Sequence, residues 1–123
     1  NMATTEAGSS MHAFGETVNA YDREIDIKFR QAAIGFAIDD FVRIFDPPRP
    51  THIKIDVDSI EARVIRGGLG LFRAGGVRSV WVEVMGPTTT PRNTEILATL
   101  RDAGFGALPK RFDHARNIEF RRQ

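Results

Sequence analysis

The sequence has no cysteine, no long apolar run and almost no net charge. Without cysteine, its 123 residues have no disulfides, thiolate metal ligands or thiol nucleophiles. No apolar stretch approaches the roughly 18 residues that cross a bilayer, and no basic start leads into an apolar segment. The 17 Lys+Arg and 16 Asp+Glu give a net charge of +1, which does not favour a nucleic-acid binder. We therefore expect a cytoplasmic protein of one domain, with no membrane or nucleic-acid partner.

The chain changes character near residue 25. Residues 1–24 are rich in Thr, Ser, Gly and Ala without a sustained period, which predicts a loop-rich lead-in segment. Residues 25–123 carry regular patterns and are expected to form the folded domain. Apolar residues at 25, 27 and 29 alternate with charged ones, which predicts a half-buried strand there.

The patterns that follow alternate between helix and strand. They predict helices at 38–45, 59–72 and 91–103, strands at 51–57 and 77–84, and short terminal strands at 105–108 and 117–120. This order is typical of an α/β sheet with right-handed crossovers. The two last strands are expected to be antiparallel at one edge, and the apolar run 77–84 favours a strand covered on both faces.

Acidic residues stand where two of these strands end. Asp56 and Asp58 close the strand at 51–57, and Glu83 lies at the end of the strand at 77–84. If the two strands are parallel neighbours, Asp56 and Glu83 share the rim at which open α/β sheets bind ligands. A carboxylate there can orient a hydroxyl group, take a proton or hold a hard cation.

Structural explanations compete for the same residues. Asp58 and Glu61 have the spacing of a capping box at a helix start, and Glu83 fits an ordinary residue near a strand end equally well. Asp56 shares a strand face with Lys54, so a local ion pair would also explain it. A polar face on a central parallel strand is unusual, however, and favours a site at Asp56.

Other features of the sequence give weaker evidence of a functional site. His12 lies in a polar loop and is expected to be solvated, and the three histidines show no metal-ligand spacing. The run Gly67-Gly68-Leu69-Gly70 lies inside or after a helix, so it does not fit a phosphate-binding loop. The basic residues near the carboxyl end are interpreted as a solvated face.

The segment 51–61, Thr-His-Ile-Lys-Ile-Asp-Val-Asp-Ser-Ile-Glu, followed by Val-Ile-Arg-Gly-Gly at 64–68, resembles the signature of the FkbM-type methyltransferases. That signature is Lys-x-Asp-x-(Asp/Glu)-Gly-x-Glu, then an apolar pair and glycine. Residues 7–15 resemble the Ala-Gly-Ser-Ser-x-His segment of one branch of the family. Residues 38–41 resemble its Leu-Asp-Asp helix start, and 80–84 resemble its next strand.

The resemblance implies a class I, Rossmann-like fold that uses S-adenosylmethionine to methylate a hydroxyl group of a sugar or secondary metabolite. The strands at 51–57 and 77–84 would be the fourth and fifth of seven. Asp56 or His12 would position or deprotonate the hydroxyl, and Asp56 would also contact the cofactor. The expected acceptor-binding residues are Ser9, Ser10, Asp58, Glu61 and Glu83.

The chain departs from the family at two points. Ser59 replaces the glycine of the signature, and no strand–GxG–helix unit for the cofactor is present. We therefore expect the carboxyl-terminal half of a methyltransferase, without its first βα units and inactive alone. Its strand at 51–57 would be a sheet edge, so we expect self-association or pairing with a missing amino-terminal half.

Two other functions stay open. One is a non-enzymatic α/β interaction module that associates through the open sheet edge. The other is a metal-dependent hydrolase that uses Asp56, Asp58 and Glu83, which the lack of clustered histidine disfavours.

Overall fold

The computed structural model describes residues 1–2, 15, 17, 23–108 and 116–123. Its contacts divide the chain into two compact units, Asn1–Gly35 and Phe36–Gln123. The first is described only in part, and the second contains all the named helices and strands.

The prediction of a strand at 25–29 is wrong. In the first unit, Met2 and Phe29 form an isolated antiparallel bridge, and the segment from 25 to 35 has no further strand structure. Phe29 and Ile34 are 48% and 87% exposed. An alternating pattern becomes a strand when a neighbour pairs with it over several residues, and one bridge does not supply that.

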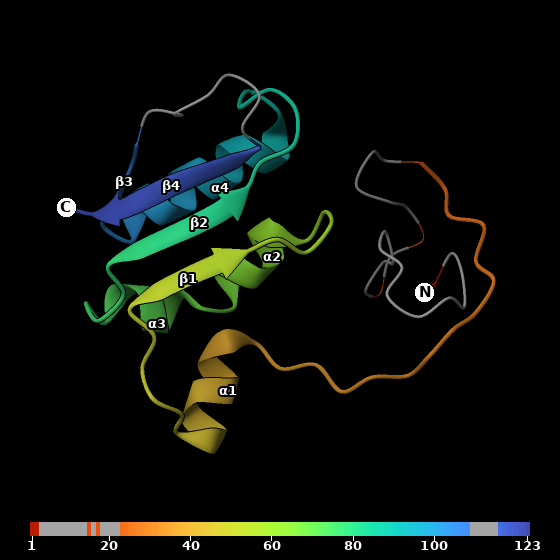
Figure 1. The fold of residues 1–123 in the computed structure, drawn as a ribbon, viewed down its shortest axis with the longest axis horizontal. Coiled ribbons are helices and arrows are strands. Elements are labelled where there is room, and N and C mark those ends of the chain that lie inside the picture. Colours follow the sequence, from red (N-terminus) through yellow and green to blue (C-terminus); the bar gives the residue numbers. More distant parts are fainter. Residues whose placement is uncertain (3–14, 16, 18–22, 109–115) are drawn as a thin grey trace. The chain divides into compact units, whose positions relative to one another are not determined.

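The second unit has a four-stranded sheet and four helices (Figure 1). Its elements are α1 (Ile38–Phe45), β1 (His52–Ile55), α2 (Glu61–Arg66), α3 (Leu69–Arg73), β2 (Ser79–Glu83), α4 (Pro91–Asp102), β3 (Phe105–Ala107) and β4 (Asn117–Arg122). Pro91 occupies the first turn of α4, and the Thr90 side chain caps that helix by accepting a hydrogen bond from the Asn93 N–H at 3.3 Å.

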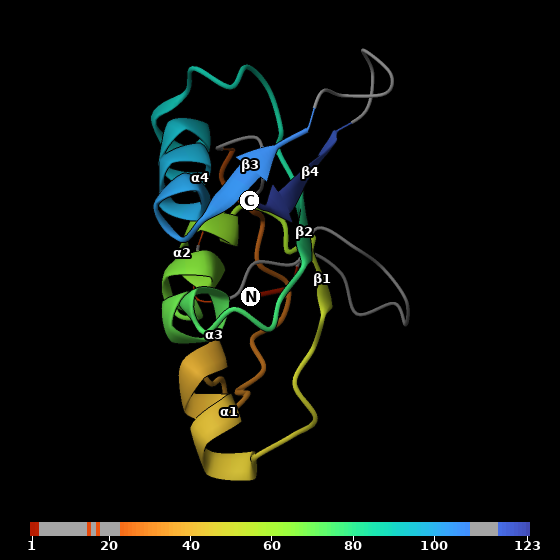
Figure 2. The same ribbon diagram turned by 90° about the vertical axis from the view of Figure 1, so that its left-hand side faces the viewer.

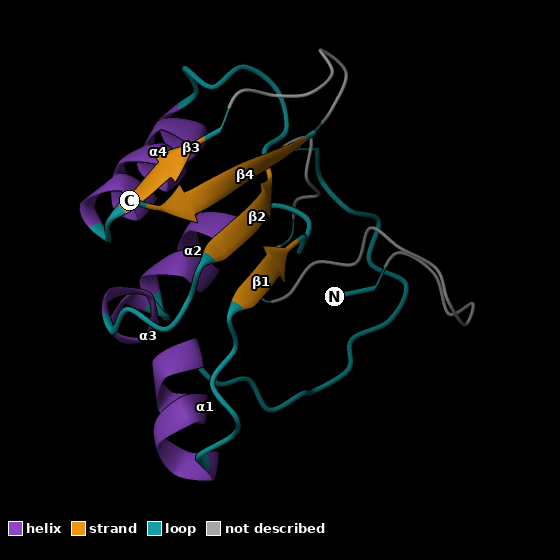
Figure 3. Cartoon of the chain, turned by 60° about the vertical axis from the view of Figure 1, so that its left-hand side comes forward, coloured by secondary structure: helices purple, strands orange, loops and turns teal. Residues whose placement is uncertain are grey.

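The strand order is β1-β2-β4-β3. β1 runs parallel to β2, whereas β4 is antiparallel to β2 and to β3. The predicted α/β class, the parallel pair and the antiparallel terminal strands at one edge are thus confirmed. The four helices lie on one face of the sheet (Figures 2 and 3).

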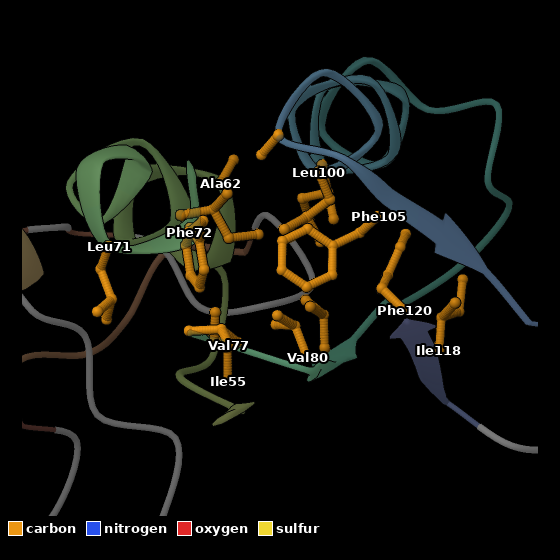
Figure 4. Close-up of a cluster of buried hydrophobic side chains, with 14 of the residues drawn as sticks. Ile55, Ala62, Leu71, Phe72, Val77, Val80, Leu100, Phe105, Ile118 and Phe120 are labelled. Carbon is orange, nitrogen blue, oxygen red and sulfur yellow. The ribbon is translucent and has the colours of Figure 1, made fainter. Parts of the chain in front are cut away.

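The core fills the space between this helix layer and the sheet (Figure 4). Val80 and Val82 of β2 are fully buried, as is Phe72 of α3, whereas Trp81 between the two valines is 39% exposed. On this second face of β2 Ser79 is buried, whereas Trp81 is open and Glu83 is partly open. The expectation that the strand at 77–84 is covered on both faces is wrong here.

The helix predicted at 59–72 is two helices, because α1 packs against Gly67 and Gly68. A Cβ on Gly67 would lie 3.2 Å from the Ala37 Cβ, and one on Gly68 would lie 3.0 Å from the Ile38 side chain. The Gly67 carbonyl turns out of the helix and accepts a hydrogen bond from the Asp39 N–H at 2.8 Å. The two glycines therefore serve close helix packing.

None of the helices in the described part of the chain has the length and apolar character needed to cross a membrane.

Candidate functional site

Asp56 and Glu83 lie beside each other at the carboxyl ends of the parallel strands. Ile55 pairs with Val82, so the next residue on each chain comes to the same rim of the sheet. Asp56 follows the last residue of β1, and Glu83 is the last residue of β2. The predicted juxtaposition of these two residues is confirmed.

The pKa values of Asp56 and Glu83 are shifted in opposite directions. The Lys54 Nζ lies 2.7 Å from the Asp56 Oδ2. This hydrogen bond lowers the pKa of Asp56 and raises the pKa of Lys54. Burial raises the pKa of Glu83, and the adjacent Asp56 adds to that rise through its charge and a hydrogen bond.

The pKa values of Asp56 and Glu83 are therefore shifted in opposite directions. The pKa of Asp56 is lowered by the hydrogen bond from Lys54, whereas the pKa of Glu83 is raised by burial and by the charge of Asp56. Two carboxyl groups whose environments separate their pKa values are a common arrangement for binding and deprotonating a hydroxyl group. The ion pair between Lys54 and Asp56, which the sequence offered as an alternative explanation for Asp56, is also present.

Asn117 is a third polar residue at this rim, and sequence reasoning missed it. It pairs directly with Glu83 across the β2–β4 ladder, so the two side chains share the open face of the sheet. Its Oδ1 is buried and has no hydrogen-bond partner. Sequence patterns could have flagged a polar residue at the start of a terminal strand, but not its partner strand.

The loop after β1 is built around Glu61. The Glu61 side chain is buried, and its Oε1 accepts hydrogen bonds from the N–H groups of Val57 at 3.4 Å and Ser59 at 3.2 Å. The capping box predicted for Asp58 and Glu61 is wrong, because α2 begins at Glu61 and its N-cap residue makes no side-chain cap bond. Glu61 stabilises the loop that follows Asp56, and this contact competes with a role in binding the acceptor.

Asp58 and Ser59 have unusual backbone conformations. The φ of Asp58 is 50°, within the left-handed region that Asp tolerates, and the φ of Ser59 is 98°. Ser59 occupies the position at which the resembling family has glycine. Only glycine adopts such a φ without strain, so Ser59 has a backbone conformation that glycine would favour.

The loop after β2 is fixed by Asn93. Its buried side chain donates hydrogen bonds to the carbonyls of Met85 and Pro87, both at 2.8 Å. These bonds tie the first turn of α4 to the chain leaving Glu83. Sequence reasoning did not identify this residue.

The remaining predicted site residues cannot be placed in this arrangement. Ser9, Ser10 and His12 lie outside the described residues. Within the described part of the chain, no group of three or more His, Asp or Glu side chains gathers as metal ligands would. A cavity of about 320 Å³ lies elsewhere, between α4 and the β3–β4 edge, where Arg101 and Phe105 line it.

The candidate site is thus a row of polar side chains at the carboxyl ends of β1 and β2. It offers two carboxyl groups whose pKa values shift in opposite directions, and an amide oxygen without a hydrogen-bond partner among the described residues, within one row of the sheet. No protein-family model, curated protein or solved structure matches this chain.

Proposed function

We propose that this chain is the carboxyl-terminal, acceptor-side part of an S-adenosylmethionine-dependent O-methyltransferase of the FkbM type. Its substrate would be a hydroxyl group of a sugar or secondary metabolite. The observation that carries the proposal is the Asp56–Glu83 pair at the carboxyl ends of parallel β1 and β2. Open α/β sheets bind ligands at this rim, and the pair places two carboxyl groups there that could hydrogen-bond to an alcohol.

The sheet supports this assignment. β1 and β2 are parallel neighbours, as the fourth and fifth strands of the expected fold would be. The two terminal strands are antiparallel to each other and lie beyond β2. Ser59 gives independent support, because its φ of 98° suits the glycine that the family signature has at this position.

The residues of this rim fit the hydroxyl acceptor better than the methyl donor. The glycine-rich turn that would hold the methionine part of the cofactor is not in the sequence. Asp56 is the residue that would approach the donor from this side. In the complete enzyme, bound S-adenosylmethionine would supply an activated methyl group.

The residues of this chain would then bind, orient and deprotonate the alcohol. The Asp56 carboxylate accepts the hydrogen bond of the hydroxyl group and takes its proton as the oxygen is methylated. The Lys54 Nζ, 2.7 Å from the Asp56 Oδ2, would hold that carboxylate in position. Glu83 and Asn117 would orient the acceptor through hydrogen bonds.

The test is methyl transfer in a reconstituted enzyme. The chain is joined to an amino-terminal half that carries the glycine-rich turn, and labelled methyl groups are followed into monosaccharides and simple polyols. We expect transfer that falls about 100-fold in Asp56→Asn, because a general base contributes about that much. Asp102→Asn, which changes an exposed acid at the end of α4, should keep the full rate. A folded fusion without transfer, or with equal rates in both variants, would show the proposal to be wrong.

The second candidate is a non-enzymatic interaction module. It is favoured by one observation: among the described residues, β1 has a neighbouring strand on one side only. A partner that binds the native chain and the Asp56→Asn variant equally well would support this candidate, because an interaction through the sheet edge does not need the carboxyl pair.

A further inference from the structure

The sheet face away from the helices carries one large aromatic side chain among polar ones. In the described part of the second unit, the helices lie on one face of the sheet (Figures 2 and 3). On the other face, Trp81 of the interior strand β2 pairs with Lys54 of β1 and with Glu119 of β4. Trp81 is 39% exposed and is the one tryptophan of the sequence. It is therefore accessible from solvent in the middle of this face.

An ion pair lies on each side of Trp81. On β1, the Lys54 Nζ lies 2.7 Å from the Asp56 Oδ2. On β4, the Arg121 Nε donates a hydrogen bond to the Glu119 Oε1, also at 2.7 Å. Neighbouring strands are about 5 Å apart, so both pairs lie close to the tryptophan. Carboxylates accept hydrogen bonds, whereas ammonium and guanidinium groups donate them, so Trp81 has a donor and an acceptor on either side.

This combination of groups matches the chemistry of a sugar ring. A pyranose has a face of C–H groups that packs flat against an aromatic ring. Its rim carries hydroxyl groups, each of which both donates and accepts hydrogen bonds. Tryptophan offers a large, rigid apolar surface, and ligand sites in general combine such a surface with a few well-placed polar groups.

We infer that this face of the sheet binds a neutral pyranose sugar, stacked on Trp81 and hydrogen-bonded by the two flanking ion pairs. Glu83 lies two residues beyond Trp81, about 7 Å along β2. A stacked hexose reaches that far with its hydroxyl rim, which brings one hydroxyl group to Asp56 and Glu83. As the acceptor of methyl transfer the sugar rests on the proposed function, whereas its binding does not.

A second layer of helices suits this face poorly. The neighbours of Trp81 on the same face of β1, β2 and β4 are all polar: His52, Lys54, Ser79, Glu83, Glu119 and Arg121. A sheet face that helices cover is apolar. The opposite face has that character, because Val80, Val82 and Phe120 are buried there beneath the helices.

A nucleotide also stacks on aromatic side chains, but the charges here disfavour it. Its phosphate groups need cationic partners. Beside Trp81, Lys54 and Arg121 are each paired with a carboxylate, so a phosphate would meet Asp56 and Glu119 at the same time. A neutral ligand avoids that repulsion, and the face therefore favours a sugar.

The test uses Trp81 as its own probe, because no other tryptophan contributes to the fluorescence of the chain. The full chain is titrated with millimolar methyl α-glucopyranoside, methyl α-mannopyranoside and methyl α-galactopyranoside, and quenching of the fluorescence by acrylamide is measured. We expect at least one of these sugars to protect Trp81 from acrylamide. Sorbitol, which has hydroxyl groups but no ring, should protect it much less.

Variants separate stacking from other effects, with Kd measured by ligand-observed NMR. Trp81→Val keeps a strand-forming side chain and should weaken binding about tenfold, as the loss of one stacking contact does. Trp81→Tyr should retain most of the binding. Phe45→Val, which removes an exposed ring on α1, should leave it unchanged. Glu119→Ala should weaken it about tenfold relative to Glu95→Ala, which breaks an exposed ion pair between α4 and Arg66.

Several outcomes would overturn the inference. These are no protection by any pyranoside, equal protection by sorbitol, stronger protection by adenosine monophosphate, or protection that grows with chain concentration because a second copy covers this face. Equal binding by Trp81→Val and Phe45→Val, both folded in thermal unfolding, would do the same. Methyl transfer by the fusion without pyranoside binding would overturn this inference alone. Pyranoside binding without transfer would overturn the proposed function alone.

Discussion

At the scale of single residues, Ser59 shows most clearly how the sequence and the backbone disagree. Its φ of 98° strains any residue with a Cβ, and such strain costs about 1–3 kcal/mol. Glycine would remove that strain but would also gain freedom in the unfolded chain. We expect Ser59→Gly to raise the free energy of unfolding by about 1 kcal/mol in urea denaturation. Thr89→Gly, in an exposed loop without a positive φ, should lower it instead. A loss of stability in Ser59→Gly would contradict the conformation described for this loop.

Glu83 predicts a pH dependence with a definite sign. Its pKa is raised in the folded chain by burial and by Asp56, so folding favours the protonated form. Below the usual pKa of glutamate, Glu83 is protonated in both the folded and the unfolded chain, so it costs no free energy of unfolding. The free energy of unfolding then falls as the pH rises through the folded pKa. Glu83→Gln should unfold at a higher temperature than the native chain at pH 7, and this difference should vanish near pH 4. Equal differences at both pH values would show that Glu83 is not desolvated.

Asp56 responds in the opposite sense. Its pKa is lowered by the hydrogen bond from Lys54, so the stability that it contributes is present above the usual pKa of aspartate and is lost in acid. Both residues are partly open to water, so we expect screening by salt to reduce these effects.

At the scale of elements, the attachment of α1 depends on Asp39. Its two carboxylate oxygens accept hydrogen bonds from the N–H groups of Gly70 and Leu71 in the first turn of α3, and a Cβ on Gly70 would lie 2.9 Å from the nearer oxygen. Loss of such a cap costs about 1 kcal/mol. We expect Asp39→Ala to lower the free energy of unfolding by that amount and to speed hydrogen exchange in α1. Asp40→Ala, which loses an exposed pair with Arg43, should change stability by less than about 0.5 kcal/mol. Equal effects would mean that Asp39 does not anchor the helix.

The elements that sequence patterns predicted well are those with local signals. Pro91 after a capping threonine defines the start of α4, and the alternation of apolar residues defines β1. The break at Gly67 and Gly68 could not be predicted, because it depends on the approach of α1 from outside the helix. The same holds for the site. Asp56 and Glu83 follow from the parallel-strand rule, whereas Asn117 joins them only because β4 inserts between β2 and β3.

At the scale of the whole molecule, the proposal assigns alcohol binding to this chain and cofactor binding to an amino-terminal half. It therefore predicts how this chain behaves when it is titrated with the cofactor product. In the proposed enzyme, the rim of β1 and β2 would supply carboxyl and amide groups for an alcohol, whereas a glycine-rich turn at a helix N-terminus is absent from the sequence. Such a turn is what binds a nucleotide-like ligand tightly in folds of this class. We therefore expect no heat of binding when the chain is titrated with micromolar S-adenosylhomocysteine.

Thermal unfolding provides a second measure of the same expectation. A ligand at 100 times its Kd would stabilise the chain by about 2.7 kcal/mol, so an unchanged Tm at millimolar S-adenosylhomocysteine excludes a micromolar site. The fusion to an amino-terminal half with the glycine-rich turn is the control, and it should gain both the heat and the Tm shift. Micromolar binding by the chain itself would place the cofactor site on the residues described here, and the rim of Asp56 and Glu83 would then have to serve the donor as well as the alcohol.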